Sequence, residues 1–114
     1  MKGEIVIVES PYAGDFDRNE EYARRCMKDC LERGEYPFAS HLLYTQVLDD
    51  TIPDERKWGM EAGWAFIEKS NFSAVYEDYG ISGGMEKGIE LAKKLKHTVE
   101  YRLIGKNDEV RNNK

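Results

Sequence analysis

The segment 80–85 holds the residues best suited to binding an anion. Ser82 is followed by Gly83 and Gly84 where the pattern predicts the start of a helix. The first N–H groups of a helix have no partner inside it, and the helix dipole favours negative charge, so a phosphate or carboxylate fits there. Alternatively, Ser82 caps the helix and the glycines only form the turn, although a cap does not require two residues that lower helix stability. The segment matches neither GxGxxG nor a Walker A loop.

Two further segments, 10–15 and 40–46, are rich in hydroxyl groups and other hydrogen-bonding side chains. His41 is either a base, a hydrogen-bonding partner for a ribose or phosphate, or a structural residue. All three segments follow predicted strands, and ligands of open parallel sheets bind where the strands end. We therefore predict one small-molecule site. Its predicted ligand-binding residues are Ser10, Pro11, Tyr12, Ala13, Gly14, His41, Asp78, Ser82, Gly83, Gly84 and Met85.

Carboxylates near these segments raise the question of catalysis. Cleavage of a glycosidic bond needs one carboxylate as nucleophile or stabiliser and a second group that donates a proton. Glu86 lies in the first turn of the predicted helix, where it is either a nucleophile or a glutamate that complements the helix dipole. The carboxylates within reach of the predicted site are Glu9, Asp15, Asp49, Asp50, Glu77, Asp78 and Glu86.

Alternating strand and helix patterns are expected to position these segments. The β-branched run at 3–9 is typical of a buried strand, and further strands are predicted at 36–40, 72–76 and 98–103. Residues 41–48 are expected to form a loop with up to one helical turn. Helices are predicted to start near Asp17, which has capping-box spacing to Glu20, at Pro53, and at Met85. This order predicts a three-layer α/β sandwich, flavodoxin-like or Rossmann-like, with a four-stranded, mainly parallel sheet.

Several other residues have both a structural and a functional interpretation. Cys26 and Cys30 share an apolar helix face and are expected to pack in the core, because two thiols alone make an incomplete zinc site. Gly59 and Gly63 lie one turn apart and indicate close packing against the sheet or another subunit, or a ligand passing close by. His97 is expected to face solvent. We expect neither a metal nor a cofactor.

The formal net charge of −5 in 114 residues argues against binding to a nucleic-acid polymer. The longest apolar runs are only a few residues, so we expect no membrane partner and a cytoplasmic location, in the host cytoplasm if a phage encodes the protein. Residues 1–105 are expected to form a single domain. The polar residues 106–114 are expected to be a disordered tail.

Four motifs together resemble a small family found in bacteria and phages. They lie at 10–14, 38–41, 80–85 and 99–102, and the segment 80–85 is the most distinctive. That family is similar to the nucleoside 2-deoxyribosyltransferase superfamily, and the resemblance covers about residues 3–104. It implies a flavodoxin-like fold that holds a nucleoside or nucleotide across the strand ends. It also implies a homo-oligomer, since relatives of this fold often dimerise and share sites.

The resemblance also implies a chemistry, which the sequence matches only in part. In active relatives a glutamate at the start of the last helix attacks the anomeric carbon, and an earlier aspartate assists the base. Glu86 and Gly88 match the Glu-x-Gly part of that motif, but Glu90 stands where an alanine is usual. Residues 62–66 replace the usual aspartate series in the second helix.

Three functions follow from these observations. The first is binding of a nucleotide or nucleotide-derived small molecule, such as an ADP-ribose-like signal, for sensing or sequestration without turnover. The alternative is an N-glycosidase or deoxyribosyltransferase that cleaves a nucleoside or nucleotide N-glycosidic bond with Glu86 as nucleophile. The third is an interaction protein without a ligand, indicated by Gly59, Gly63 and the aromatic second helix.

Overall fold

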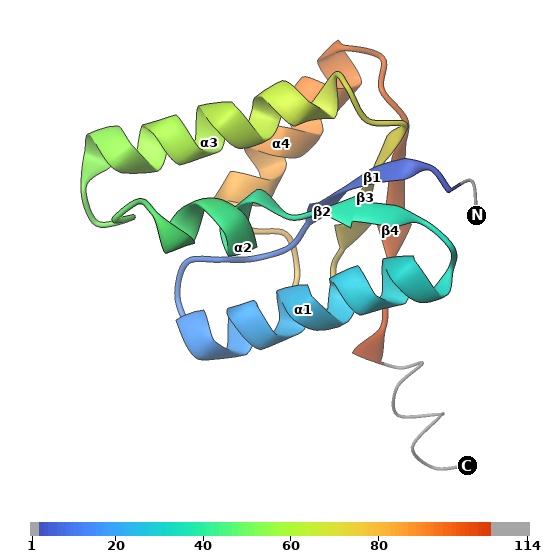
Figure 1. Cartoon of the computed structure of the whole chain (residues 1–114), viewed down its shortest axis with the longest axis horizontal. Helices are drawn as coiled ribbons and strands as arrows, with labels where there is room; N and C mark the ends of the chain where they lie inside the picture. The colour runs from blue at the N-terminus through green and yellow to red at the C-terminus, as the bar shows by residue number, and fades with distance from the viewer. Residues whose placement is uncertain (1–2, 106–114) are drawn as a thin grey trace.

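Four short strands form one parallel sheet in the order β2-β1-β3-β4, as the computed structural model of the chain shows (Figure 1). The structure describes residues 3–105, so the tail predicted at 106–114 lies outside the described residues. The strands are β1 (Ile5–Glu9), β2 (Tyr36–Phe38), β3 (Phe72–Tyr76) and β4 (Val99–Arg102). Ile7 of β1 is in register with Phe38 of β2 and Ser73 of β3. The predicted parallel α/β fold is confirmed.

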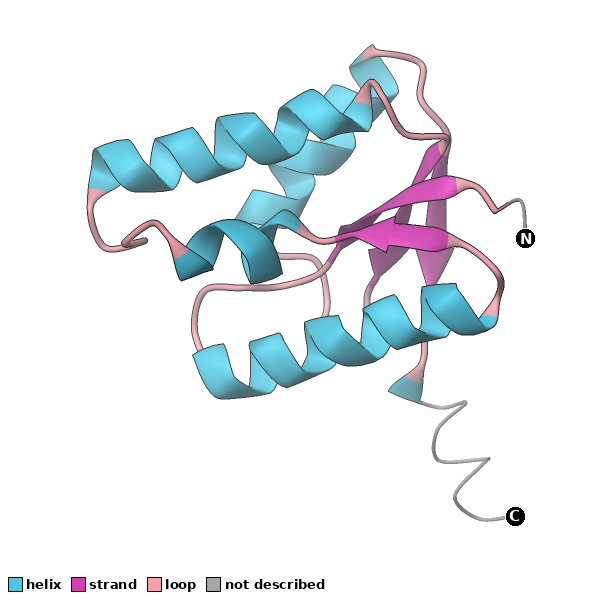
Figure 2. Cartoon of the chain, in the orientation of Figure 1, coloured by secondary structure: helices cyan, strands magenta, loops and turns pink. Residues whose placement is uncertain are grey.

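Helices cover both faces of this sheet. Helix α1 (Phe16–Glu32) lies on one face, and α3 (Pro53–Ile67) and α4 (Gly83–Lys94) lie on the other (Figure 2). Val6 and Val8 pack toward α1, whereas Ile7 packs with Ile67 of α3 and Ala92 of α4. Because successive strand residues point to opposite faces, Glu9 points to the same face as Ile7. No helix within residues 3–105 is long and apolar enough to cross a membrane.

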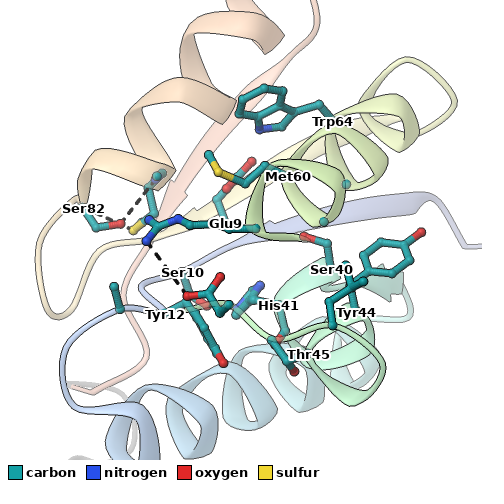
Figure 3. Close-up of a pocket in the computed structure, with 18 of the residues that line it drawn as sticks. Glu9, Ser10, Tyr12, Ser40, His41, Tyr44, Thr45, Met60, Trp64 and Ser82 are labelled. Atoms are coloured by element: carbon teal, nitrogen blue, oxygen red, sulfur yellow. Dashed lines mark hydrogen bonds and ion pairs between the residues drawn. The ribbon is translucent and has the colours of Figure 1, made fainter. Parts of the chain in front are cut away.

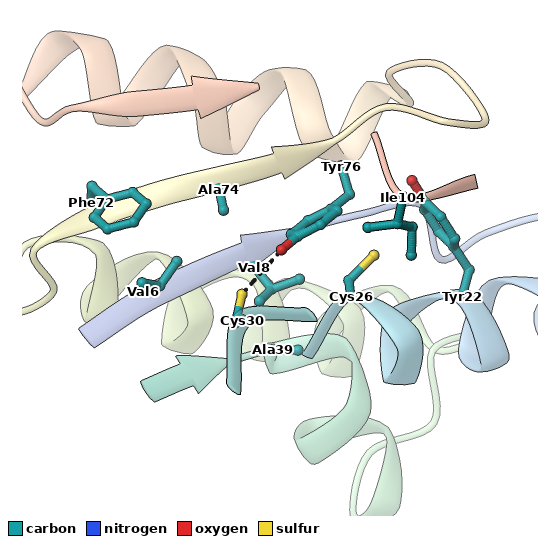
Figure 4. Packing of buried hydrophobic residues seen from close by; sticks show 10 residues of the cluster. All are labelled: Val6, Val8, Tyr22, Cys26, Cys30, Ala39, Phe72, Ala74, Tyr76 and Ile104. Carbon is teal, nitrogen blue, oxygen red and sulfur yellow. Dashed lines mark hydrogen bonds between the residues drawn. The ribbon is translucent and has the colours of Figure 1, made fainter. Parts of the chain in front are cut away.

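The core between the sheet and α1 contains both cysteines. Cys26 and Cys30 are fully buried free thiols, as predicted (Figure 4). The Tyr76 hydroxyl lies 3.2 Å from the Cys30 Sγ and donates to the Asp29 carboxylate at 2.8 Å. Buried Arg102 donates to the same hydroxyl at 3.0 Å, so β3, β4 and α1 are joined by one polar network inside the core.

Helix α1 begins at Phe16, next to Asp17 as predicted, but with a different cap. Its N-cap is Asp15, whose carboxylate accepts a hydrogen bond from the Arg18 N–H at 3.1 Å. Asp17 lies in the first turn instead of forming a capping box with Glu20. The capping box is absent because Asp15 already caps the helix two residues upstream, which leaves Asp17 to complement the helix dipole.

The segment after β2 is more helical than predicted. The strand ends at Phe38, and the short helix α2 (Ser40–Leu43) leads into a 3₁₀ turn, η1 (Tyr44–Gln46). A Cβ on Gly63 would lie 2.7 Å from the Ser40 Oγ, and one on Gly59 would lie 3.3 Å from the Leu48 Cδ1. Both glycines therefore let α3 pack closely against the α2 segment of the same chain. Both glycines also line the cavity described below, as expected if a ligand passes close by.

His97 also differs from expectation. It precedes β4 and is half-buried instead of facing solvent. Its Nε2 forms a hydrogen bond with the Ser70 Oγ at 3.0 Å, and Ser70 in turn donates to the Ile67 carbonyl at 2.8 Å. This histidine fastens the end of α3 to the start of β4, at the edge of the sheet opposite to the predicted site.

Candidate functional site

A cavity of about 280 Å³ opens at the carboxyl end of β1 (Figure 3). Strand β1 lies between β2 and β3, so the chain crosses over at this point and leaves the crevice that open parallel sheets use for ligands. The cavity is bordered by the loop after β1, by α2 and η1, by α3, and by the start of α4. Its lining includes Glu9, Ser10, Tyr12, Ala13, Ser40, His41, Tyr44, Thr45, Asp50, Arg56, Met60, Trp64, Ser82, Gly83, Gly84 and Met85.

Ser10 and His41 connect the loop after β1 to α2. The Ser10 Oγ and the His41 Nε2 form a 2.7 Å hydrogen bond. Burial lowers the pKa of His41 to about 4, so the ring is neutral at physiological pH. The edge of the Tyr12 ring approaches the imidazole at a centroid distance of 6.4 Å. The neutral imidazole and the two hydroxyl groups give this wall hydrogen-bonding capacity without a charge.

The N-terminus of α4 forms a second wall. Ser82 is the N-cap, and its Oγ accepts a hydrogen bond from the Met85 N–H at 3.3 Å. A Cβ on Gly83 or Gly84 would meet no atom within 4 Å, and neither glycine has a positive φ. Neither packing nor backbone conformation therefore requires these glycines. They leave open space at the start of α4, where the first N–H groups of a helix have no partner inside it.

Glu9 is a functional candidate that the sequence included only in a long set of carboxylates. It is the last residue of β1, on the face that carries Ile7, and it lines the cavity. Burial raises the pKa of the Glu9 carboxyl to about 8. At neutral pH the group is therefore mostly protonated and can donate a hydrogen bond. The sequence could have indicated this, because Glu9 lies two residues after Ile7 in a buried strand and so points to the same face.

Arg56 was also missed by sequence reasoning. It is the one Lys or Arg side chain that lines the cavity within residues 3–105. The guanidinium lies 4.0 Å from the Asp50 carboxylate, and both groups are partly exposed, so this ion pair is weak. An anion in the cavity would compete with Asp50 for the guanidinium. The sequence could have indicated this, because α3 begins at Pro53 and Arg56 lies at the end of the first turn of that helix.

Aromatic side chains complete the cavity. Tyr12, Tyr44 and Trp64 come from the loop after β1, from η1 and from α3. Burial raises the pKa of Tyr12 above its usual value, so its hydroxyl stays protonated at physiological pH. Aromatic faces next to polar groups suit a ligand that carries both a flat ring and hydrogen-bonding atoms.

Comparison with known proteins assigns a family and supports the fold. A family model described as a domain of unknown function (DUF7768) matches residues 4–102. The chain belongs to the DUF7768 family. No curated protein sequence matches the chain.

A solved structure of a 2-deoxyribosyltransferase from the psychrotolerant bacterium Bacillus psychrosaccharolyticus is similar to this DUF7768 chain. The TM-score is 0.63 at 12% sequence identity, and the match covers 88% of this chain and 72% of the other. At such low identity, the similarity shows a shared flavodoxin-like fold. It is consistent with the resemblance that the sequence motifs indicated.

Eight of the predicted ligand-binding residues line the cavity of this DUF7768 protein. They are Ser10, Tyr12, Ala13, His41, Ser82, Gly83, Gly84 and Met85. Pro11, Gly14 and Asp78 are not part of its lining. Pro11 is buried, and Gly14 takes a positive φ of 105° in the turn before α1, so both shape the loop instead of facing the cavity.

Asp78 holds the chain after β4 in place. Its carboxylate accepts hydrogen bonds from the Tyr22 hydroxyl and from the N–H groups of Ile104, at 3.0 Å, and Gly105, at 2.6 Å. Burial alone would raise the pKa of the Asp78 carboxyl, but these hydrogen bonds lower it below its usual value. The structure therefore places Asp78 in a structural cluster beside α1, outside the predicted ligand site.

Glu86 is also outside the lining of the cavity. It is exposed in the first turn of α4, whereas its neighbour Met85 is buried and faces the cavity. Successive helix residues are rotated by about 100°, and this rotation places Met85 toward the cavity and Glu86 toward solvent. Within residues 3–105, no group of three or more His, Cys, Asp or Glu side chains is arranged to hold a metal ion.

Proposed function

We propose that this protein binds a nucleotide or nucleotide-derived small molecule in the cavity and holds it without turnover, for sensing or sequestration. The observation that carries the proposal is the N-terminus of α4, where Gly83 and Gly84 leave open space beside the cavity. Two glycines at this position are unfavourable for the helix, and nothing in the fold requires them. A ligand that approaches the backbone closely accounts for both.

The start of α4 suits an anionic group, whereas Asp50 and Glu55 place negative charge elsewhere in the lining. Backbone N–H groups and the helix dipole favour a phosphate, and Arg56 is the nearby side chain that adds positive charge. A protein with a net charge of −5 can hold a single phosphate in this way, because the attraction is local and does not depend on a basic surface.

The rest of the cavity suits a nucleoside. Tyr12, Tyr44 and Trp64 offer ring faces on which a base stacks, which contributes about 1–3 kcal/mol per base in other proteins. Ser10 and His41 offer hydrogen bonds to a sugar hydroxyl. A volume of about 280 Å³ lies just below the usual range of small-molecule sites, roughly 300–1,000 Å³.

We propose no turnover because neither Glu86 nor Glu9 is suited to act as a nucleophile. Glu86, the candidate nucleophile, is exposed outside the cavity lining. Glu9, which lies inside the cavity, is mostly protonated at neutral pH because its pKa is raised to about 8 by burial. A protonated carboxyl group is a poor nucleophile, so neither residue is prepared to attack an anomeric carbon.

The second candidate function is cleavage of an N-glycosidic bond, by hydrolysis or deoxyribosyl transfer. The fold shared with a 2-deoxyribosyltransferase and the protonated Glu9 in the cavity favour it. In this alternative Glu86 would turn inward and attack the anomeric carbon, while Glu9 would give its proton to the leaving base. Water or a second base would then release the sugar from Glu86 and return a proton to Glu9.

Mass spectrometry separates these functions. The protein is incubated with deoxynucleoside monophosphates, NAD and cyclic ADP-ribose-type compounds, and the solution and the heat-released ligand are both analysed. Intact ligand recovered after denaturation supports binding without turnover. Free base that appears with the wild type and the Glu90→Gln control, but not with Glu86→Gln, supports the second function. Glu90 is a matched control because it is also an exposed glutamate of α4. No binding and no base would contradict both functions and leave an interaction protein.

A further inference from the structure

We propose that Glu9 is a direct ligand contact, whose carboxyl group donates a hydrogen bond to an acceptor atom of the ligand, and that Gly88 keeps this group in place. The inference rests on the proposed function. It describes what the ligand contacts at the end of the site opposite to the phosphate. The ligand it describes has an anionic group at one end and a neutral acceptor, such as a ring nitrogen or carbonyl oxygen, at the other.

The first observation is the close approach of Glu9 to α4. An ideal Cβ on Gly88 would lie 2.3 Å from the Glu9 Oε2, 2.9 Å from the Cδ and 3.1 Å from the Oε1. A side chain at position 88 would therefore displace this carboxyl group, which is the far end of a flexible side chain. Gly88 has no positive φ, and a glycine inside a helix costs about 1 kcal/mol relative to alanine. Gly88 therefore lets the carboxyl group of Glu9 keep its present position against α4.

The second observation is that the carboxyl group of Glu9 has no hydrogen-bond partner among residues 3–105. It nevertheless lines the cavity, where Figure 3 shows it among the side chains that include Ser10, Met60 and Ser82. The Glu9 side chain is partly exposed, so its unpaired oxygens are open to the cavity, and a ligand that pairs with them gains affinity. The other titratable or charged groups of the lining are Tyr12, His41, Tyr44, Asp50, Glu55 and Arg56, and α4 contributes none.

Protonation determines which ligand atom Glu9 contacts. Burial raises the pKa of Glu9 to about 8, so at pH 7 its O–H group is available as a donor. Gly83 and Gly88 are five residues apart in α4, which places the two ends of the site about 7.5 Å apart along the helix. That separation leaves room for a sugar between a phosphate at the helix N-terminus and an acceptor atom at Glu9. A charged carboxylate there would instead weaken the binding of an anion.

A ligand-free experiment tests the position of Glu9. A ¹³C NMR titration of the glutamate side chains should show one pKa well above the usual range in the wild type. That resonance should be lost in Glu9→Gln and return to an ordinary pKa in Gly88→Ala, where the new methyl group displaces the carboxyl group. The free energy of unfolding is then measured for Glu9→Ala, Gly88→Ala and the double variant. Gly88→Ala should destabilise the protein less when the Glu9 side chain is already removed. Additive costs would overturn the proposed role of Gly88.

A binding experiment tests the contact itself, with dAMP and ADP-ribose as probes at pH 7 and pH 9.5. Affinity of the wild type should fall about tenfold at the higher pH, because Glu9 loses its proton. Phosphate, with a second pKa near 6, keeps its charge over this range. Glu9→Gln should bind within about threefold of the wild type at pH 7 and show no such fall, since its amide still donates, whereas Glu9→Ala should lose about tenfold at pH 7.

The outcomes separate this inference from the proposed function. Equal affinity of Glu9→Ala and the wild type would overturn the contact while leaving the proposed function intact. Failure of the folded wild type to bind either probe would contradict the proposed function, and the contact with it. If Glu9→Ala does not fold, the pH profile of Glu9→Gln against the wild type decides, and parallel profiles would overturn the contact.

Discussion

Ser10 and His41 are joined by a 2.7 Å hydrogen bond across the cavity wall, although they are 31 residues apart in the chain. Ser10 follows β1, and His41 belongs to α2, which follows β2. Because β1 and β2 are parallel neighbours, their carboxyl ends bring these two side chains together. The bond fixes the orientation of the imidazole, whose neutral ring then presents a defined surface to the cavity.

Removal of this bond should weaken ligand binding as well as the fold. Ser10→Ala leaves a buried imidazole nitrogen without its partner, so we expect a loss of about 1–2 kcal/mol in unfolding free energy and a several-fold loss of dAMP affinity. Urea unfolding and isothermal titration calorimetry measure the two effects. Ser70→Ala is the matched control, because it removes a similar serine–histidine bond to His97 far from the cavity. If both variants change affinity equally, the Ser10–His41 pair has no specific role.

Asp78 should stabilise the fold without contributing to ligand binding. Asp78→Asn replaces one acceptor oxygen by an NH₂ group that faces the N–H donors of Ile104 and Gly105, so we expect a loss of about 1–3 kcal/mol in unfolding free energy. Its affinity for dAMP, measured well below the unfolding temperature, should match that of the wild type. A large loss of affinity with unchanged stability would instead assign Asp78 to the ligand site.

Among the charged residues, Arg102 should destabilise the protein most when it is replaced. It is almost fully buried and donates to both carboxylate oxygens of Glu35, at 2.8 and 2.7 Å. We expect Arg102→Met to destabilise the protein by about 3–5 kcal/mol, because Glu35 loses its partner. Lysine cannot form the paired contact and should restore little of the loss.

Chemical denaturation measures this effect, with Arg24→Met as the control. Arg24 forms an ion pair with Glu20 at 2.8 Å in which both side chains are exposed, so its loss should cost at most about 1 kcal/mol. Equal effects of the two substitutions would contradict the structural role assigned to Arg102.

Stability should depend on pH through Glu9 and His41 in opposite directions. The pKa of Glu9 is raised from 4.5 to about 8 in the folded protein, so its contribution is fully present below pH 4.5 and is lost as the pH rises to about 8. The pKa of His41 is lowered from 6.5 to about 4, so its contribution is present above pH 6.5 and is lost as the pH falls to about 4.

Glu9→Gln separates these two effects. It removes the ionisable group, so the variant should gain stability relative to the wild type between pH 5 and pH 8.5, by about 1–3 kcal/mol. Denaturant titrations at several pH values measure the difference. A constant difference between the two proteins across this range would show that the carboxyl group of Glu9 does not ionise abnormally.

The sequence predicted the elements well because their signals are local. The β-branched run ending at Val8 marks β1, and Ser82 before two glycines marks the start of α4. The side on which a residue lies depends on packing between distant elements. Met85 faces the cavity and Glu86 faces solvent because α4 buries Ile89 and Ala92 against the sheet, and this rotation is not visible from a short motif.

Asp78 and Glu9 also depend on contacts between segments far apart in the sequence, with opposite results. Asp78 follows β3 at the expected edge, but the chain after β4 returns to it and occupies its carboxylate. In the sequence Glu9 is one of seven carboxylates within reach of the predicted site, and only the fold brings it against Gly88, 79 positions later. Long-range contacts of this kind decide which polar residues remain available to a ligand.

The most direct test of the nucleotide site is the effect of Gly83→Leu on binding of dAMP and ADP-ribose, measured by calorimetry on the folded variant. A Cβ at position 83 meets no protein atom within 4 Å, so the variant should fold normally while its side chain enters the space assigned to the phosphate. We predict that binding of both compounds is lost while the unfolding free energy changes by less than about 1 kcal/mol. Binding by Gly83→Leu with the affinity of the wild type would contradict the site.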